Sequence, residues 1–99
     1  MNSQNHLDLS LIITTYQSVE KLRLVLESVE WQSMRPKQII VADDGSDSKT
    51  QALVSEYRCR LRCPVIHSWQ PDTNFRLARS RNLAALKAIG SWLIFIDGD

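Results

Sequence analysis

Short apolar runs alternate with longer amphipathic stretches along this chain, and that alternation limits the fold more than any other feature. The apolar runs cover residues 9–14, 38–42, 64–69 and 91–96. Apolar residues with helical spacing lie between them, at residues 19–33, from residue 48 onward, and at 76–89. Strands that alternate with helices pair in parallel, and the helices cover both sheet faces. We therefore expect a three-layer α/β/α fold around a mainly parallel sheet of about four strands, the last of them buried.

Capping signals refine the expected helix ends. Ser18 precedes the first helical stretch and is a candidate N-cap, and the sequence from Ser48 to Gln51 has the form of a capping box. Gly90 follows the third stretch and is a candidate C-cap.

Composition indicates one ordinary globular domain. The chain has 99 residues, 43% of them hydrophobic, and a formal net charge of +1. We expect a single domain over residues 1–99, with 1–8 as a flexible N-terminus, and no nucleic acid partner, because the charge is nearly balanced. Cys59 and Cys63 lack metal-site or disulfide-scaffold spacing, so reduced thiols are expected. The sequence contains no export signal and no apolar run long enough to span a membrane, so we expect a cytoplasmic protein.

Polar residues follow the predicted strands at the point where each strand ends. These segments cover residues 14–16, 43–46, 69–72 and 97–99, and three of the four are rich in hydroxyls or carboxylates. Parallel strands end at one edge of the sheet, where ligands of such folds bind. The sequence therefore predicts a site at that edge.

Two aspartate clusters at this edge can bind cations or polar ligands. Asp97 and Asp99 are separated by Gly98, which we expect to let the backbone bend so that both carboxylates face one point. Mg²⁺ and Mn²⁺ prefer such oxygen ligands. Asp44, beside Asp43, could accept a hydrogen bond from a base N–H or a ribose hydroxyl. Each cluster could instead be an Asp-Gly turn or a helix cap.

The third helical stretch carries a basic residue on an apolar face. Arg81 lies near the middle of a face made of residues 77, 78, 84, 85, 88 and 89. It could extend to solvent with its stem buried. Alternatively, Arg76, Arg79 and Arg81 near a helix N-terminus suit a diphosphate held between cations and a metal.

Four stretches resemble the family 2 glycosyltransferases, whose GT-A fold is Rossmann-like and which transfer sugar from a nucleotide-sugar with inversion. They are LSLIITTYQ at residues 9–17, ESVEWQS at 27–33, IIVADDGSDSKT at 39–50 and NFRLARSRNLAALKAIGSWLIFIDGD at 74–99. The chain is thus similar to the N-terminal half of a GT-A fold, ending at the family's DxD motif. The segment HSWQPDTNFRLARSRN is most similar to bacterial members that build surface polysaccharides, including chondroitin-polymerase-like enzymes.

The resemblance implies roles for particular residues at the sheet edge. Thr14 and Tyr16 match residues that border the nucleotide base, and Asp44 matches the acid that binds uracil, with Asp43 beside it. Arg81 matches a basic residue near the diphosphate. In the DxD motif, Asp97 would contact ribose or sugar, and Asp99 would bind Mn²⁺ or Mg²⁺. His67 and Trp69 have no counterpart there, and we expect structural roles for both.

The resemblance also implies a reaction and its partners. The expected function is inverting transfer from a nucleotide-sugar donor, UDP-linked, to a glycan or lipid-linked acceptor in cell-surface polysaccharide biosynthesis. The full-length enzyme could associate peripherally with the inner face of the membrane. The catalytic base of the family lies beyond Asp99, so we expect this chain to be an inactive, truncated fragment.

Two other classes share parts of this pattern. A receiver-like α/β module also binds Mg²⁺ with clustered acids, but its paired acids follow the first strand. A sugar nucleotidyltransferase would need a glycine-rich basic loop after the first strand, and TTYQSVEK at residues 14–21 has no glycine.

Overall fold

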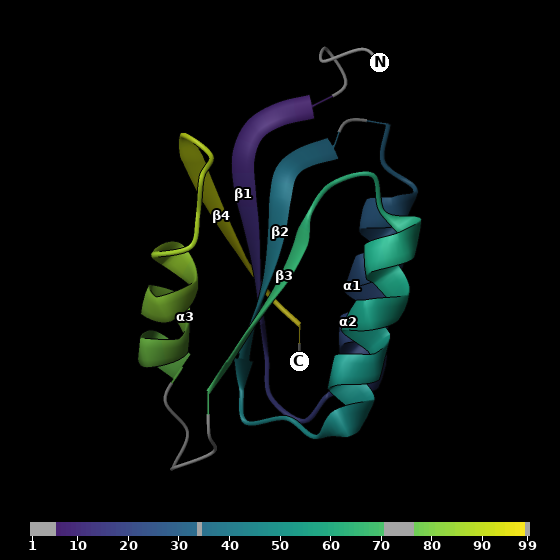
Figure 1. The fold of residues 1–99 in the computed structure, drawn as a ribbon, viewed down its shortest axis with the longest axis vertical. Helices are drawn as coiled ribbons and strands as arrows, with labels where there is room; N and C mark the ends of the chain where they lie inside the picture. Colours follow the sequence, from purple (N-terminus) through teal and green to yellow (C-terminus); the bar gives the residue numbers. More distant parts are fainter. Residues whose placement is uncertain (1–5, 34, 71–76, 99) are drawn as a thin grey trace.

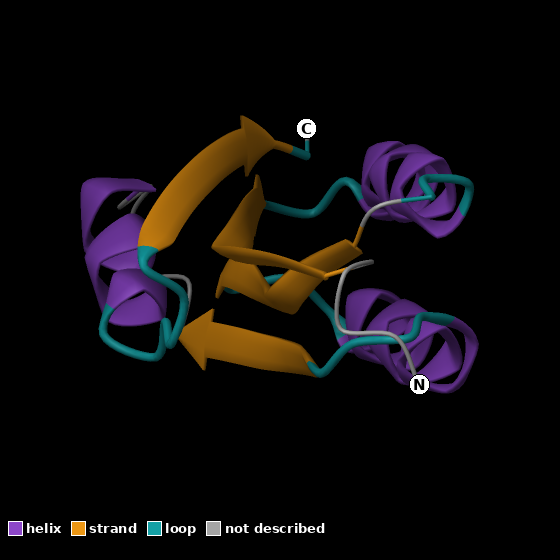
Figure 2. Ribbon diagram, turned by 90° about the horizontal axis from the view of Figure 1, so that it is seen from above, coloured by secondary structure: helices purple, strands orange, loops and turns teal. Residues whose placement is uncertain are grey.

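The computed structural model describes residues 6–33, 35–70 and 77–98. Strands and helices alternate strictly along these residues, in the order β1 (His6–Thr15), α1 (Val19–Glu30), β2 (Arg35–Asp44), α2 (Ser48–Arg60), β3 (Val65–Gln70), α3 (Leu77–Ala85) and β4 (Trp92–Asp97). The strands form one parallel sheet in the order β3-β2-β1-β4. Helices α1 and α2 cover one face and α3 covers the other (Figures 1 and 2). The predicted three-layer α/β architecture is confirmed.

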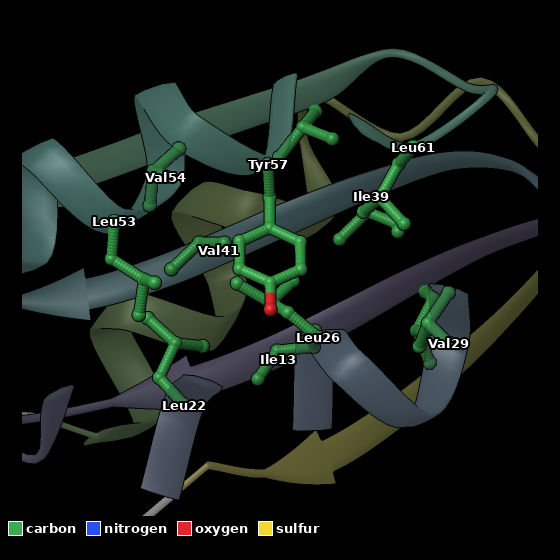
Figure 3. Close-up of a cluster of buried hydrophobic side chains, with 12 residues drawn as sticks. Ile13, Leu22, Leu26, Val29, Ile39, Val41, Leu53, Val54, Tyr57 and Leu61 are labelled. Carbon is green, nitrogen blue, oxygen red and sulfur yellow. The ribbon is translucent and has the colours of Figure 1, made fainter. Parts of the chain in front are cut away.

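The larger core lies between the sheet and helices α1 and α2. Figure 3 shows side chains from both helices meeting those of the central strands around the buried ring of Tyr57. Its fully buried members include Ile13, Val41, Leu22 and Leu26. Each large aliphatic side chain buried in this way contributes about 1.5–3 kcal/mol to stability.

A smaller core lies under α3. Ile12 and Ile40 pack there against Ala84, as the small-residue face of the third helical stretch predicts. Successive residues of a strand point to opposite faces. Because Ile12 faces α3 and Ile13 faces α1 and α2, even-numbered positions near the ends of β1 and β2 face α3. This alternation decides which polar residues meet at the sheet edge.

The connection between α3 and β4 corrects the expected role of Gly90. Helix α3 ends at Ala85, so Gly90 is not its C-cap. Instead, the Gly90 N–H donates to Ser10 Oγ at 2.9 Å, and the Ile89 N–H donates to Gln38 Oε1 at 2.6 Å. A Cβ on Gly90 would lie 2.6 Å from the Leu9 carbonyl carbon. This position requires glycine because the β1 backbone passes so close.

The helix starts agree with expectation at α1 and differ from it at α2. Ser18 is the N-cap residue of α1, as predicted, and its carbonyl accepts the Leu22 N–H at 3.1 Å, although its side chain makes no cap bond. The cap of α2 is Asp47, whose carboxylate accepts the Lys49 N–H at 3.0 Å, and the helix begins at Ser48. Strand β1 begins at His6, earlier than the predicted residue 9, and its pairing with β2 is irregular between Leu7 and Ser10.

Strand β4 is exposed, although its apolar run predicts a buried strand. All six of its residues are exposed, including Ile94 at 45% and Phe95 at 41%. Within the described residues β4 pairs only with β1, and the helices pack mainly on the other three strands. The apolar run therefore correctly predicts a strand but not its burial.

Two further expectations concern the cysteines and the membrane. Cys59 and Cys63 are free thiols, as expected. Burial raises the pKa of the half-buried Cys63 thiol. None of the helices in the described ranges is both long and apolar enough to cross a membrane.

Candidate functional site

The polar ends of three strands lie side by side at the carboxyl edge of the sheet. In the strand register, Thr14 lies opposite Asp97 of β4, and Thr15 lies opposite Asp43 of β2. The topology therefore brings together segments separated by up to 83 positions in sequence. The predicted concentration of polar residues at this edge is present in the structure.

The closest contacts at the edge join β1, β4 and α3. The Thr14 hydroxyl donates to Asp97 Oδ1 at 2.9 Å, and an Arg81 guanidinium nitrogen lies 3.4 Å from the same oxygen. The Arg81 guanidinium also lies 5.7 Å from the centre of the Phe95 ring. The Asp97 side chain remains 63% exposed. Two donors thus orient a carboxylate whose other faces are open to a ligand.

Gly98 allows the end of β4 to approach β1 closely. Its N–H donates to the Thr14 carbonyl at 2.6 Å, and a Cβ there would lie 2.8 Å from that oxygen. Its φ is not in the left-handed region, which among the described glycines is adopted by Gly45 at 90°. Gly98 is therefore required for close approach rather than for a sharp bend. Asp99, the predicted metal ligand, lies outside the described residues.

Asp43 and Asp44 are adjacent, but they face opposite sides of the sheet. Asp43 is fully buried on the side of α1 and α2, where Oδ1 accepts the Ser46 N–H at 2.8 Å and Oδ2 lies 2.7 Å from His67 Nε2. Asp44 is 1% exposed on the side of α3, and its Oδ1 accepts from Gln70 Nε2 at 2.5 Å. Asp44 therefore shares a sheet face with Thr14, whereas Asp43 does not.

The predicted site residues thus divide into two groups. Thr14, Asp44, Arg81 and Asp97 belong to the α3 face of the carboxyl edge. Asp43 lies on the opposite face, at the end of β2, and Tyr16 is half-buried in the loop after β1. Of the other two arginines, Arg79 is exposed and Arg76 lies outside the described residues.

Three side chains at the edge were not predicted as site residues. His67 and Gln70 of β3 contact Asp43 and Asp44 at the end of β2, and Trp69 contacts Ser46 in the turn that follows. The strand register contains the signal that identifies two of them: Val41 pairs with His67 and Asp43 pairs with Trp69, so these four side chains share one face. A pocket of about 550 Å³ opens beside them, lined by Ser46, Asp47, Ser48, Gln51, Arg58, His67 and Trp69.

The donor atoms at the α3 face suit a hard divalent cation. Within the described ranges, no group of three or more metal-ligating side chains is assembled. Magnesium-type sites, however, often use only one or two carboxylates together with substrate phosphates. The exposed Asp97 carboxylate fits that pattern, so the residues present are compatible with such an ion.

Comparison with known proteins agrees with the fold and the motifs. The model of the glycosyl transferase family 2 matches residues 10–99. Validoxylamine A glucosyltransferase of Streptomyces hygroscopicus subsp. limoneus is 34% identical over 90% of this chain and 20% of its own length. Hyaluronan synthase of Pasteurella multocida is 27% identical over 95% of this chain and 10% of its own. The crystal structure of Staphylococcus aureus TarS superposes with a TM-score of 0.76 at 31% identity, over 94% of this chain and 17% of that one.

These matches define an α/β domain that is similar to part of several glycosyltransferases. The chain belongs to glycosyl transferase family 2. It spans between 10% and 29% of the length of its curated relatives. Membership of this family argues against the receiver-like and nucleotidyltransferase alternatives.

Proposed function

We propose that this chain binds the nucleotide-sugar donor, UDP-linked, for inverting sugar transfer in cell-surface polysaccharide biosynthesis. The acceptor is a glycan or a lipid-linked sugar, and the reaction takes place in the cytoplasm, with peripheral association at the inner membrane face. The observation that carries this proposal is the contact of Thr14 and Arg81 with one open carboxylate, Asp97, at the edge where parallel sheets bind ligands.

The proposed roles follow from position along this edge. Asp44 accepts hydrogen bonds from the uracil ring, and Thr14 and Tyr16 border the base, with Asp43 next to Asp44. Arg81 lies toward the diphosphate, whose negative charge a guanidinium pairs with well. Asp97 contacts the ribose or the sugar. The adjacent positions of Thr14 and Asp97 in the strand register support this order of groups.

A divalent cation, Mn²⁺ or Mg²⁺, completes the proposed site. Asp99 is the proposed ligand, with Asp97 beside it. The ion would supply positive charge that stabilises the leaving diphosphate. Thr14 and Arg81 orient Asp97 for this environment by fixing one of its two oxygens.

Sugar transfer also needs a carboxylate that takes the proton from the attacking acceptor hydroxyl. We assign no residue of this chain to that role. The acids at the carboxyl edge are already engaged with the nucleotide and the metal in this proposal. We therefore expect residues 1–99 to bind the donor without transferring sugar, and detectable transfer by the purified chain would overturn that division of roles.

Calorimetry with UDP and Mn²⁺ tests the proposal. Asp44→Asn removes the charge but keeps the size of a side chain proposed to bind the base, and it should weaken UDP binding by roughly tenfold. Asp47→Asn is the matched control, because Asn also caps helices well and Asp47 lies in the turn directly after the strand that ends at Asp44. Equal UDP affinity in the wild type and Asp44→Asn would contradict the proposed base recognition.

A further inference from the structure

Two side chains of β3 contact the end of β2 and the turn that follows it. His67 Nε2 lies 2.7 Å from Asp43 Oδ2, and Trp69 Nε1 donates to the Ser46 carbonyl at 3.1 Å. Both bonds join β3 to the segment from Asp43 to Ser46, which includes Asp44, the proposed base-binding acid. His67 and Trp69 therefore restrain that segment from the side of the sheet opposite to α3.

The bond from His67 matters because Asp43 is fully buried. Its carboxylate has 0% exposure and accepts from the Ser46 N–H in addition to its contact with the imidazole. A buried carboxylate that loses a hydrogen-bond partner is strongly disfavoured. Without His67, we expect the segment from Asp43 to Ser46 to move so that the Asp43 carboxylate reaches water.

Ser46 links the end of β2 to the loop after β1 through hydrogen bonds. Its hydroxyl accepts the Gln17 N–H at 2.8 Å, while its own N–H donates to Asp43 and its carbonyl accepts from Trp69. Gln17 has a φ of 48°, a conformation that non-glycine residues seldom adopt. It directly follows Tyr16, so bonds through Ser46 fix the positions of both segments proposed to border the base.

We infer that His67 and Trp69 are positioning residues that hold the Thr14–Tyr16 and Asp43–Asp44 segments at the separation needed to receive a nucleotide base. The inference rests on the proposed function, since the ligand is the base of the proposed donor. Neither side chain touches the ligand in this account. Their effect passes through Asp43 and Ser46. It is confined to the part of the site that is proposed to bind the nucleotide base.

Three variants of the 99-residue chain separate this role from general stability. His67→Leu removes the bond to Asp43, His67→Gln keeps an N–H donor, and Trp69→Phe removes only the bond to Ser46. Trp92→Phe is the control for the last variant, because Trp92 is 73% exposed in β4. The probes are uridine, which reports on the base half of the site, and inorganic pyrophosphate with Mn²⁺, which reports on the half near Arg81 and Asp97.

Titrations followed by NMR should distinguish the two halves. His67→Leu should weaken uridine binding by roughly tenfold, since a buried partner is lost, and Trp69→Phe should weaken it less. Pyrophosphate binding should stay unchanged in both variants, and His67→Gln should restore most of the uridine affinity. The amide resonances of Ser46 and Gln17 should shift in His67→Leu and stay in place in Trp92→Phe.

Each contrary result has a definite meaning. Wild-type uridine affinity in His67→Leu, or equal weakening of uridine and pyrophosphate without rescue by His67→Gln, would overturn the positioning role. If His67→Leu does not fold, the uridine and pyrophosphate affinities of Trp69→Phe and His67→Gln test the positioning role instead. If the wild type binds neither uridine nor UDP, the proposed function fails, and the inference fails with it. If the wild type binds uridine and UDP but the variants do not behave as predicted, only the inference fails.

Discussion

The Thr14 hydroxyl donates to Asp97 Oδ1 across 2.9 Å, which joins the ends of two strands 83 positions apart in sequence. Arg81 approaches the same oxygen from α3 at 3.4 Å. One carboxylate oxygen of Asp97 is thus held by the protein, and the side chain is still 63% exposed. This arrangement orients the carboxylate before any ligand arrives.

Replacing Thr14 by valine should impair Mn²⁺-dependent UDP binding more than it impairs folding. The variant keeps the shape of a side chain that is 1% exposed and removes the hydroxyl bond to Asp97, so about 1 kcal/mol of stability should be lost. Calorimetry should register roughly tenfold weaker binding of UDP with Mn²⁺. Thr15→Val is the matched control, because the Thr15 hydroxyl is buried with no hydrogen-bond partner among the described residues. Equal UDP affinities for the two variants would argue against an orienting role of Thr14.

Adding a methyl group at Gly98 should separate the end of β4 from β1. The new Cβ would lie 2.8 Å from the Thr14 carbonyl oxygen and 2.9 Å from Ile13 Cγ2, which is too close for ordinary contact. Gly98→Ala should therefore lower the free energy of unfolding by about 1–3 kcal/mol, measured by urea denaturation. An unchanged denaturation midpoint would mean that this close approach is not needed for stability.

Gln38 joins the connection between α3 and β4 to the sheet through hydrogen bonds. Its Oε1 accepts from Ser10 Oγ and from the Ile89 N–H, both at 2.6 Å. Gln38→Leu would leave the buried Ser10 hydroxyl without this acceptor, at a cost of about 1–3 kcal/mol, and would also remove the acceptor of the Ile89 N–H. Thermal denaturation should reveal a large loss of stability, whereas Gln51→Leu on the exposed face of α2 should stay close to the wild type. Similar melting temperatures for the two variants would refute this role of Gln38.

Asp8 should make stability depend on pH in the acid range. Hydrogen bonds from the Ser91 hydroxyl and N–H lower the pKa of the Asp8 carboxyl below its ordinary value of 3.8. The unfolded chain therefore binds this proton more readily. The Asp8 contribution is complete above pH 3.8 and is lost as pH falls through the lowered pKa of the folded state. The free energy of unfolding, measured by urea denaturation at several pH values in this range, should depend less on pH in Asp8→Asn than in the wild type. The same pH dependence in both proteins would contradict the assignment.

Most of the fold could be predicted from the sequence, because the alternation of apolar runs and helical stripes permits few topologies. The order of strands and helices, the small-residue face of α3 and the polar carboxyl edge follow from residue spacing alone. Gly90 could not be assigned in this way. Its need for glycine arises from the passing backbone of Leu9, and that contact depends on the fold rather than on helix capping.

Burial and side-chain partners were harder to predict. An apolar run such as that of β4 predicts a strand, but whether it is buried depends on what packs against it. Asp43 and Asp44 look equivalent in the sequence, and the alternation of side chains along β2 places them on opposite faces. The partner of Asp43 is His67, which lies 24 residues away and becomes a neighbour only through the pairing of β2 with β3.

A titration of the isotope-labelled 99-residue chain with UDP and Mn²⁺, followed by amide NMR, tests the central claim most directly. Binding at the carboxyl edge predicts shifts concentrated at residues 14–17, 43–46, 81 and 97–98, with little change at the opposite edge near Lys37 and Ser91. Shifts concentrated near Lys37 and Ser91, or the absence of any saturable shift, would contradict the claim that this edge binds the nucleotide-sugar.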